Sequence, residues 1–202
     1  MKMSGKPPAL RGRPRGFDAE KALDRALKVF WRKGYEGASL SDLTRAMGIN
    51  RPSLYAAFGD KEELFRKALD RYTVGPAAYF STALAEPTAR AVAEMLLFGA
   101  AAQFADPRHP GCLFVQGALS CGESASSIRA ELAARRMAGE SALRRRFVRA
   151  VRDHDLPPGS NAADLARYIA TVMHGMSVQA AGGAGRAELR RIARTALQAW
   201  PA

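Results

Sequence analysis

The sequence contains few cysteines, few acidic residues and no long apolar run. Two cysteines in 202 residues are too few for a disulfide framework. If Cys112 and Cys121 share a helix, its rise per residue separates them by roughly 13 Å, too far for a disulfide. The apolar stretch around residues 95–104 is broken by Gly99 and Gln103 and is too short to span a bilayer. The N-terminus shows no secretory signal. We therefore expect a cytoplasmic protein.

Acidic residues are outnumbered, because 19 Asp and Glu face 31 Lys and Arg, which gives a formal net charge of +12. Such an excess favours a polyanion or an anionic membrane surface as the partner. The first sixteen residues carry basic but no acidic side chains, namely Lys2, Lys6, Arg11, Arg13 and Arg15. We expect a flexible basic arm over residues 1–16, and a merely solvated tail is the alternative.

Residue patterns typical of catalysis and of metal binding are also missing. There is no recognisable nucleophile–His constellation and no glycine-rich phosphate loop. His109, His154 and His174 have no metal-ligand spacing. We expect no enzyme activity, no metal and no cofactor. Thiol sensing by either cysteine stays open, although burial in a core is the commoner role of a cysteine.

Apolar residues recur at helical spacing from Asp18 onward, and no strand-like alternation is long enough to form a sheet. The sequence predicts an all-α fold, with Asp, Asn and Ser as N-caps and Gly and Pro as breaks. About nine helices are expected, at residues 19–33, 40–47, 51–58, 61–84 with a break at Gly75 and Pro76, 88–104, 112–122, 126–154, 162–182 and 187–200.

Two of the expected helices are short and are joined by a tight turn at Gly48. Helices of about seven residues are stable only when packed, so this pair needs the preceding helix as support. These are the dimensions of a helix-turn-helix, expected over residues 17–60. The outer face of the second helix would present side chains that can read base edges, while helix N-termini would hold phosphates. The predicted DNA contacts are Ser39, Asn50, Arg51, Pro52, Ser53, Tyr55 and Lys61, with Arg11, Arg13 and Arg15 from the arm. Simple capping is the alternative for Ser39 and Asn50, and a solvated surface position is the alternative for Arg51.

The segment from Phe17 to Tyr72 resembles the DNA-binding region of the TetR family of bacterial transcriptional regulators. The matching residues are Gly34 and Tyr35, Ser39, the turn from Ala46 to Ile49, Leu54 and Tyr55, Phe58, Lys61, Glu62 and Leu64. The resemblance implies a homodimer that binds a near-palindromic operator. It also implies a repressor that a small molecule releases from DNA, although activation is an alternative.

By the same resemblance, residues 61–202 would form a ligand-binding and dimerisation domain. The residues expected to contact the ligand are Phe98, Phe104, Phe114, Met137, Phe147, Met173 and His174. The last two helices would form the dimer interface through Ala166, Ala170, Gly175, Ser177, Ala181, Leu189, Ile192 and Ala196, with intramolecular core as the alternative. Two rival functions are an enzyme and a non-specific architectural DNA-binding protein driven by charge.

Overall fold

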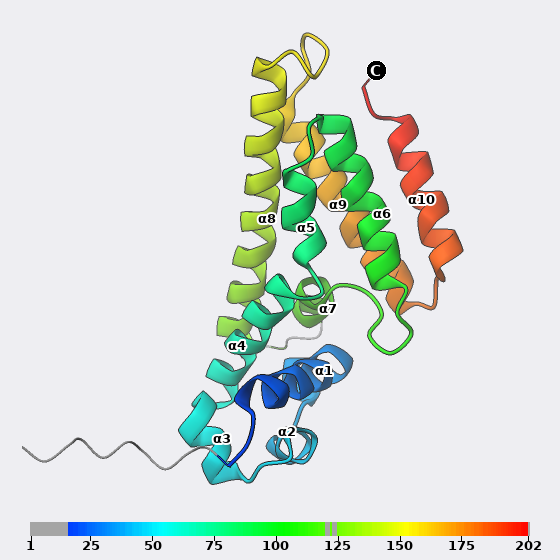
Figure 1. Cartoon of the computed structure of the whole chain (residues 1–202). Coiled ribbons are helices and arrows are strands. Elements are labelled where there is room, and N and C mark those ends of the chain that lie inside the picture. Colours follow the sequence, from blue (N-terminus) through cyan, green and yellow to red (C-terminus); the bar gives the residue numbers. More distant parts are fainter. Residues whose placement is uncertain (1–15, 120–121, 123–124, 202) are drawn as a thin grey trace, which may run out of the picture.

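A computed structural model describes residues 16–119, 122 and 125–201, and every regular element in these ranges is a helix (Figure 1). This agrees with the all-α prediction. In chain order the helices are α1 (Ala19–Gly37), α2 (Leu40–Met47), α3 (Arg51–Phe58), α4 (Lys61–Val74), α5 (Ala78–Leu84), α6 (Ala89–Phe104), α7 (Leu113–Leu119), α8 (Ser126–Arg152), α9 (Ala162–Ala181) and α10 (Arg186–Gln198).

The described ranges contain ten helices rather than the nine expected, because Gly75 separates α4 from α5 completely. Two other boundaries also differ from the prediction. Gly34 has φ 70° and ψ 177°, so it kinks α1, but the helix resumes and continues to Gly37. The final helix ends at Gln198, two residues before the buried Trp200.

The helices enclose two hydrophobic clusters. One cluster joins α1–α4 and includes Leu113 of α7 with Ile128 and Leu132 from the start of α8. The other is formed chiefly by α6, α8, α9 and α10. Because α4 packs into the first cluster, the N-terminal core extends beyond the boundary predicted at residue 60.

α1, α2 and α3 lie together at one end of the molecule, and α8 extends from beside α4 to the opposite end (Figure 1). α10 lies alongside α6 at the edge of the bundle. In the part of the chain that is described, no helix is long and apolar enough to cross a membrane.

Candidate nucleic-acid interface and internal cavity

The start of α2 is fixed by a reciprocal cap between Ser39 and Asp42. The Ser39 hydroxyl accepts a hydrogen bond from the Asp42 amide at 3.0 Å, and the Asp42 carboxylate accepts one from the Ser39 amide at 3.2 Å. Lys33 lies 2.8 Å from the same carboxylate, and its hydrogen bond is the main reason that the pKa of Asp42 falls to about 2. Ser39 is exposed, but its side chain already has the capping role that was the alternative to DNA contact.

The turn between α2 and α3 depends on Gly48, which adopts φ 71° and ψ 32°. Its amide donates to the carbonyls of Thr44 and Arg45, and the Ile49 amide donates to Thr44 at 3.1 Å. A side chain in this left-handed conformation costs roughly 1–2 kcal/mol, so glycine permits the tight turn. The turn sets the angle at which α3 leaves α2.

α3 buries only Leu54 and Phe58, which anchor it to the N-terminal core. Asn50 caps the helix by accepting a hydrogen bond from the Ser53 amide at 2.9 Å. The other side of α3 is open, because Arg51 and Pro52 are exposed and Tyr55 keeps 48% of its surface accessible. Asn50 is also exposed and Ser53 is half-buried, so each of these predicted reading residues keeps accessible surface.

Arg51 extends toward α2, where its guanidinium donates to the hydroxyl of Ser41 at 3.2 Å. The sequence analysis did not select Ser41, which is exposed near the start of α2. Its polarity and its position close to the cap were the available signals. The contact makes the exposed surface continuous across both short helices and orients the long Arg51 side chain.

Lys61, a predicted DNA contact at the N-terminus of α4, is not freely exposed. It is half-buried, and its ammonium lies 4.5 Å from the centre of the Tyr35 ring. Burial lowers the pKa of Lys61, and Glu36 acts in the opposite direction. A phosphate contact by Lys61 would therefore have to compete with its contact to Tyr35.

The described chain begins beside α3. Gly16 and Phe17 line a shallow hollow together with Gly48, Asn50 and Ser53. The Phe17 ring also packs near Phe58, with ring centres 6.2 Å apart. The predicted DNA contacts Arg11, Arg13 and Arg15 precede this point and lie outside the described residues.

A cavity of about 670 Å³ lies between α4, α5, α7, α8 and α9. This volume is within the range of small-molecule sites, and most of the cavity wall is apolar. Four of the predicted ligand residues line it: Phe104, Phe114, Met173 and His174. The sequence analysis missed other lining residues, among them Tyr72, Tyr79, Phe80, Cys112, Arg135, Arg136 and Glu140.

Three predicted ligand residues do not line this cavity. Phe98 lies under the guanidinium of Arg190, 5.2 Å from it. Met137 points outward, with 68% of its surface exposed. Phe147 is buried in the core and packs edge-on against Trp200. Helical spacing did not distinguish these positions from the neighbouring ones that face the cavity.

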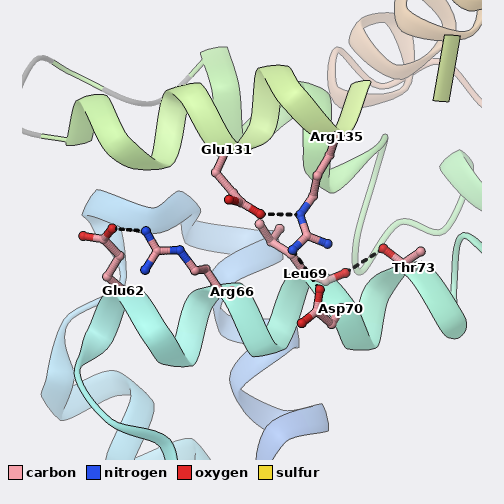
Figure 2. A network of polar contacts seen from close by, with 7 residues as sticks. All are labelled: Glu62, Arg66, Leu69, Asp70, Thr73, Glu131 and Arg135. Atoms are coloured by element: carbon pink, nitrogen blue, oxygen red, sulfur yellow. Dashed lines mark hydrogen bonds and ion pairs between the residues drawn. The ribbon is translucent and has the colours of Figure 1, made fainter. Parts of the chain in front are cut away.

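Arg135 connects two helices at the cavity wall. Its guanidinium lies 2.8 Å from Glu131 of α8 and 2.8 Å from Asp70 of α4 (Figure 2). A second ion pair, between Glu62 and Arg66, lies within α4 and does not reach α8 (Figure 2). Arg135 therefore ties α4 to α8 at the cavity.

Cys112 lines the cavity, and burial raises the pKa of its thiol, with Tyr72 opposing that effect through a hydrogen bond. The protonated form, which is the weaker nucleophile, is therefore favoured. Cys121 lies outside the described residues. Among the residues that are described, no group of three or more His, Cys, Asp or Glu side chains is placed to hold a metal.

Comparison with known proteins agrees with this geometry. Residues 22–68 match the family described as bacterial regulatory proteins, tetR family. The chain is 36% identical over 194 residues to the HTH-type transcriptional repressor ComR of Escherichia coli. The aligned residues make up 95% of this chain and 92% of ComR. The chain belongs to the TetR family.

Other TetR-family proteins show similarity over part or nearly all of the chain. The repressor BdcR of Escherichia coli is 35% identical over 108 residues, which is 52% of this chain and 55% of BdcR. A cysteine variant of the TetR-family regulator CifR, solved with a 26-base-pair operator DNA, is 43% identical. It aligns with a TM-score of 0.88 over 94% of this chain and all of that chain.

The predicted dimer contacts of this TetR-family chain divide into buried and exposed residues. Ala166, Ser177 and Leu189 have no accessible surface, so in this conformation they cannot contact a second copy. The Ser177 hydroxyl instead accepts a hydrogen bond from the Cys112 amide at 2.8 Å. Ala196 is buried as well, whereas Ala170 and Ile192 are half-buried and Gly175 and Ala181 are exposed.

The apolar side of α10 packs against α6 and α9, so the stripe expected to join two protomers is part of the protomer core. Its outer side carries polar residues such as Arg190, Arg194 and Thr195. Exposed aliphatic side chains lie elsewhere, at Val74 of α4, Leu119 of α7, Met137 and Val148 of α8 and Val178 of α9. Gly175 of α9 also has open space around the position of a Cβ.

Proposed function

We propose that this TetR-family protein is a transcriptional repressor that binds a near-palindromic operator as a homodimer and is released by a small molecule. The exposed polar side of α3, held on the helix-turn-helix, is the observation that carries the proposal. The names of ComR and BdcR as repressors, and the operator complex of CifR, support it. Its action on DNA would place it in the cytoplasm.

In the proposed complex, α3 enters the major groove. Arg51 can bind a guanine with two hydrogen bonds, and the Pro52 ring can contact a thymine methyl group. Ser53 and Tyr55 would add contacts to bases or phosphates. The arm would start beside α3, because Gly16 lies there, and its arginines would suit a narrow minor groove.

The cavity is the proposed ligand site, and α4 forms part of its wall through Tyr72 and Thr73. Tyr72 also contacts both the N-terminal core and α7. Its ring lies 4.8 Å from Trp31 of α1 and 5.0 Å from Phe114 of α7, centre to centre. A ligand that displaced Tyr72 would therefore disturb the support of the DNA-binding helices. Coupling of about 1–3 kcal/mol would change operator affinity roughly 5- to 150-fold.

We propose that α8 and α9, rather than α9 and α10, form the dimer interface. Met137, Val148 and Val178 are exposed apolar side chains on these two helices. The open space at Gly175 suits the close approach of a helix from a second copy. A two-fold dimer would place two α3 helices on half-sites about one turn of DNA apart.

The Arg51→Ala variant tests the assignment of α3. If Arg51 reads a guanine, the variant should lose about 1–3 kcal/mol of discrimination at one base pair of each half-site. The measurement is fluorescence anisotropy on a set of duplexes with single-base changes, at one salt concentration. Arg194→Ala on the exposed side of α10 is the control and should keep the wild-type profile. An equal loss for every duplex would make Arg51 a phosphate contact, and no loss would remove it from the interface.

A further inference from the structure

The cavity wall carries one cation whose charge is not balanced by a carboxylate. Arg136 lines the cavity, and its guanidinium donates to the Phe114 carbonyl at 2.8 Å. It forms no ion pair within the described part of the chain. A guanidinium has five N–H donors, so most of its donors remain available for another partner.

The other two charged residues of the wall, Arg135 and Glu140, already form ion pairs. Arg135 is paired with Glu131 and Asp70. Glu140 is paired with Arg167, at 3.0 Å. Among the charged residues of the described cavity wall, these contacts leave Arg136 without an ion pair, and the rest of the wall is mainly aromatic and aliphatic.

His174 adds a second polar group close to Arg136. Burial lowers the pKa of His174 below its usual 6.5, and the charge of Arg136 lowers it further, while Glu140 opposes both. A neutral imidazole supplies one donor and one acceptor. Arg136 and His174 can thus hold a small acidic group, while Phe104, Phe114 and Met173 offer apolar surface in the same cavity.

We propose that the ligand of this cavity is an amphipathic carboxylate whose head group binds Arg136 beside His174 and whose apolar body fills the remaining space. This inference rests on the proposed function, because it names the ligand of the proposed regulatory site. A carboxylate matches the two parallel donors of a guanidinium, and charge-assisted bonds of this kind are among the strongest hydrogen bonds in proteins. The volume of the cavity requires an apolar body larger than that of a simple metabolite acid such as acetate.

The test compares probes that differ in charge but not in shape. Titration calorimetry would measure binding of decanoate and 2-naphthoate, and of the corresponding neutral amides and of decylamine, to the full-length protein. We expect both acids, or the one whose body fits the cavity, to bind about tenfold or more tightly than the matching amide. Decylamine should bind more weakly than decanoate, because Arg136 repels it.

Two variants connect the preference to Arg136. Arg136→Gln should abolish the preference for acid over amide, whereas Arg136→Lys should keep part of it. Arg194→Gln, on the exposed side of α10 and not part of the cavity wall, is the control and should bind the acids like the wild type. Unfolding midpoints of the ligand-free proteins would show whether each variant is folded. If Arg136→Gln does not fold, the reduced acid preference expected of Arg136→Lys still tests the role of Arg136.

Three results would overturn the proposal: equal binding of acid and amide, a preference that survives in folded Arg136→Gln, or no binding of either acid by the folded wild type. Operator binding is measured on the same preparations. Operator binding without acid preference would refute this inference alone, and acid preference without operator binding would refute only the proposed function.

Discussion

Individual residues were predicted well where their role is local. Asp18, Ser39 and Asn50 cap the helices that follow them, as the sequence indicated, because a cap depends on residues only two or three positions away. Contacts across the fold were not predictable in this way. The approach of Lys61 to Tyr35 and the outward direction of Met137 depend on how distant helices pack.

His174 gives a prediction for the dependence of stability on pH. Its pKa in the folded chain is below 6.5, mainly because of burial, so the unfolded chain binds a proton first as the pH falls. The free energy of unfolding should therefore decrease as the pH falls from about 7.5 to about 5.5. For each unit by which the pKa of His174 is lowered, the free energy of unfolding should fall by at most about 1.4 kcal/mol over this pH range. Denaturant unfolding at the two pH values should show a smaller decrease for His174→Asn than for the wild type.

Part of the decrease should persist in that variant, because burial also lowers the pKa of His109. The variant His154→Asn changes an exposed histidine and serves as the control. If His174→Asn and the wild type lost the same free energy between the two pH values, the account of His174 would be wrong.

At the scale of elements, α4 connects the proposed DNA-binding and ligand-binding parts. It packs into the N-terminal core through Leu64 and Phe65, and it lines the cavity through Tyr72. The sequence predicted the break at Gly75, because glycine and proline adjoin there. It did not predict that α4 shares a core with α1 or that Arg135 joins α4 to α8, since neither contact leaves a periodic pattern.

The pair of Arg135 with Asp70 should stabilise the position of α4 seen here. We propose that this α4 position is the one that binds DNA. Asp70→Asn should then weaken operator binding without ligand by up to about fivefold, the upper range for a solvent-exposed ion pair. Anisotropy titration of operator duplex with the purified variant measures this change.

Glu62→Gln provides the matched control, because it removes an ion pair of α4 that stays within that helix. It should change operator affinity less than Asp70→Asn does. An equal effect of both variants would show that the charge of α4 affects operator binding and that the ion pair between Arg135 and Asp70 does not. An unchanged operator affinity of Asp70→Asn would exclude a contribution of this ion pair.

At the scale of the whole molecule, the pattern of apolar residues and helix breaks predicted the all-α fold and the helix-turn-helix. It did not locate the dimer surface, because a stripe of small and apolar residues looks the same whether it meets a partner or the protein's own core. The sides of α9 and α10 that carry Ala166 and Leu189 face the core. The proposed interface on α8 and α9 follows from exposure, which the sequence does not contain.

Val178→Glu tests this interface. If Val178 lies between two copies, burying an unpaired carboxylate should raise the dimer dissociation constant at least tenfold, since such burial costs several kcal/mol. Thr195→Glu adds the same charge on the exposed side of α10 and should leave the dimer intact. Sedimentation equilibrium measures both. A fully dimeric Val178→Glu protein, or dissociation caused by Thr195→Glu, would contradict the assignment.

The central claim is that two copies of α3 read a specific operator. Selection from a random duplex library with the full-length protein, followed by affinity measurement at one fixed salt concentration, tests it most directly. We predict that the enriched DNA contains an inverted repeat and binds about 10³-fold or more tightly than random duplex. If the selected DNA contained no inverted repeat, or if selected and random DNA bound equally tightly, the result would contradict the account and favour binding by charge alone.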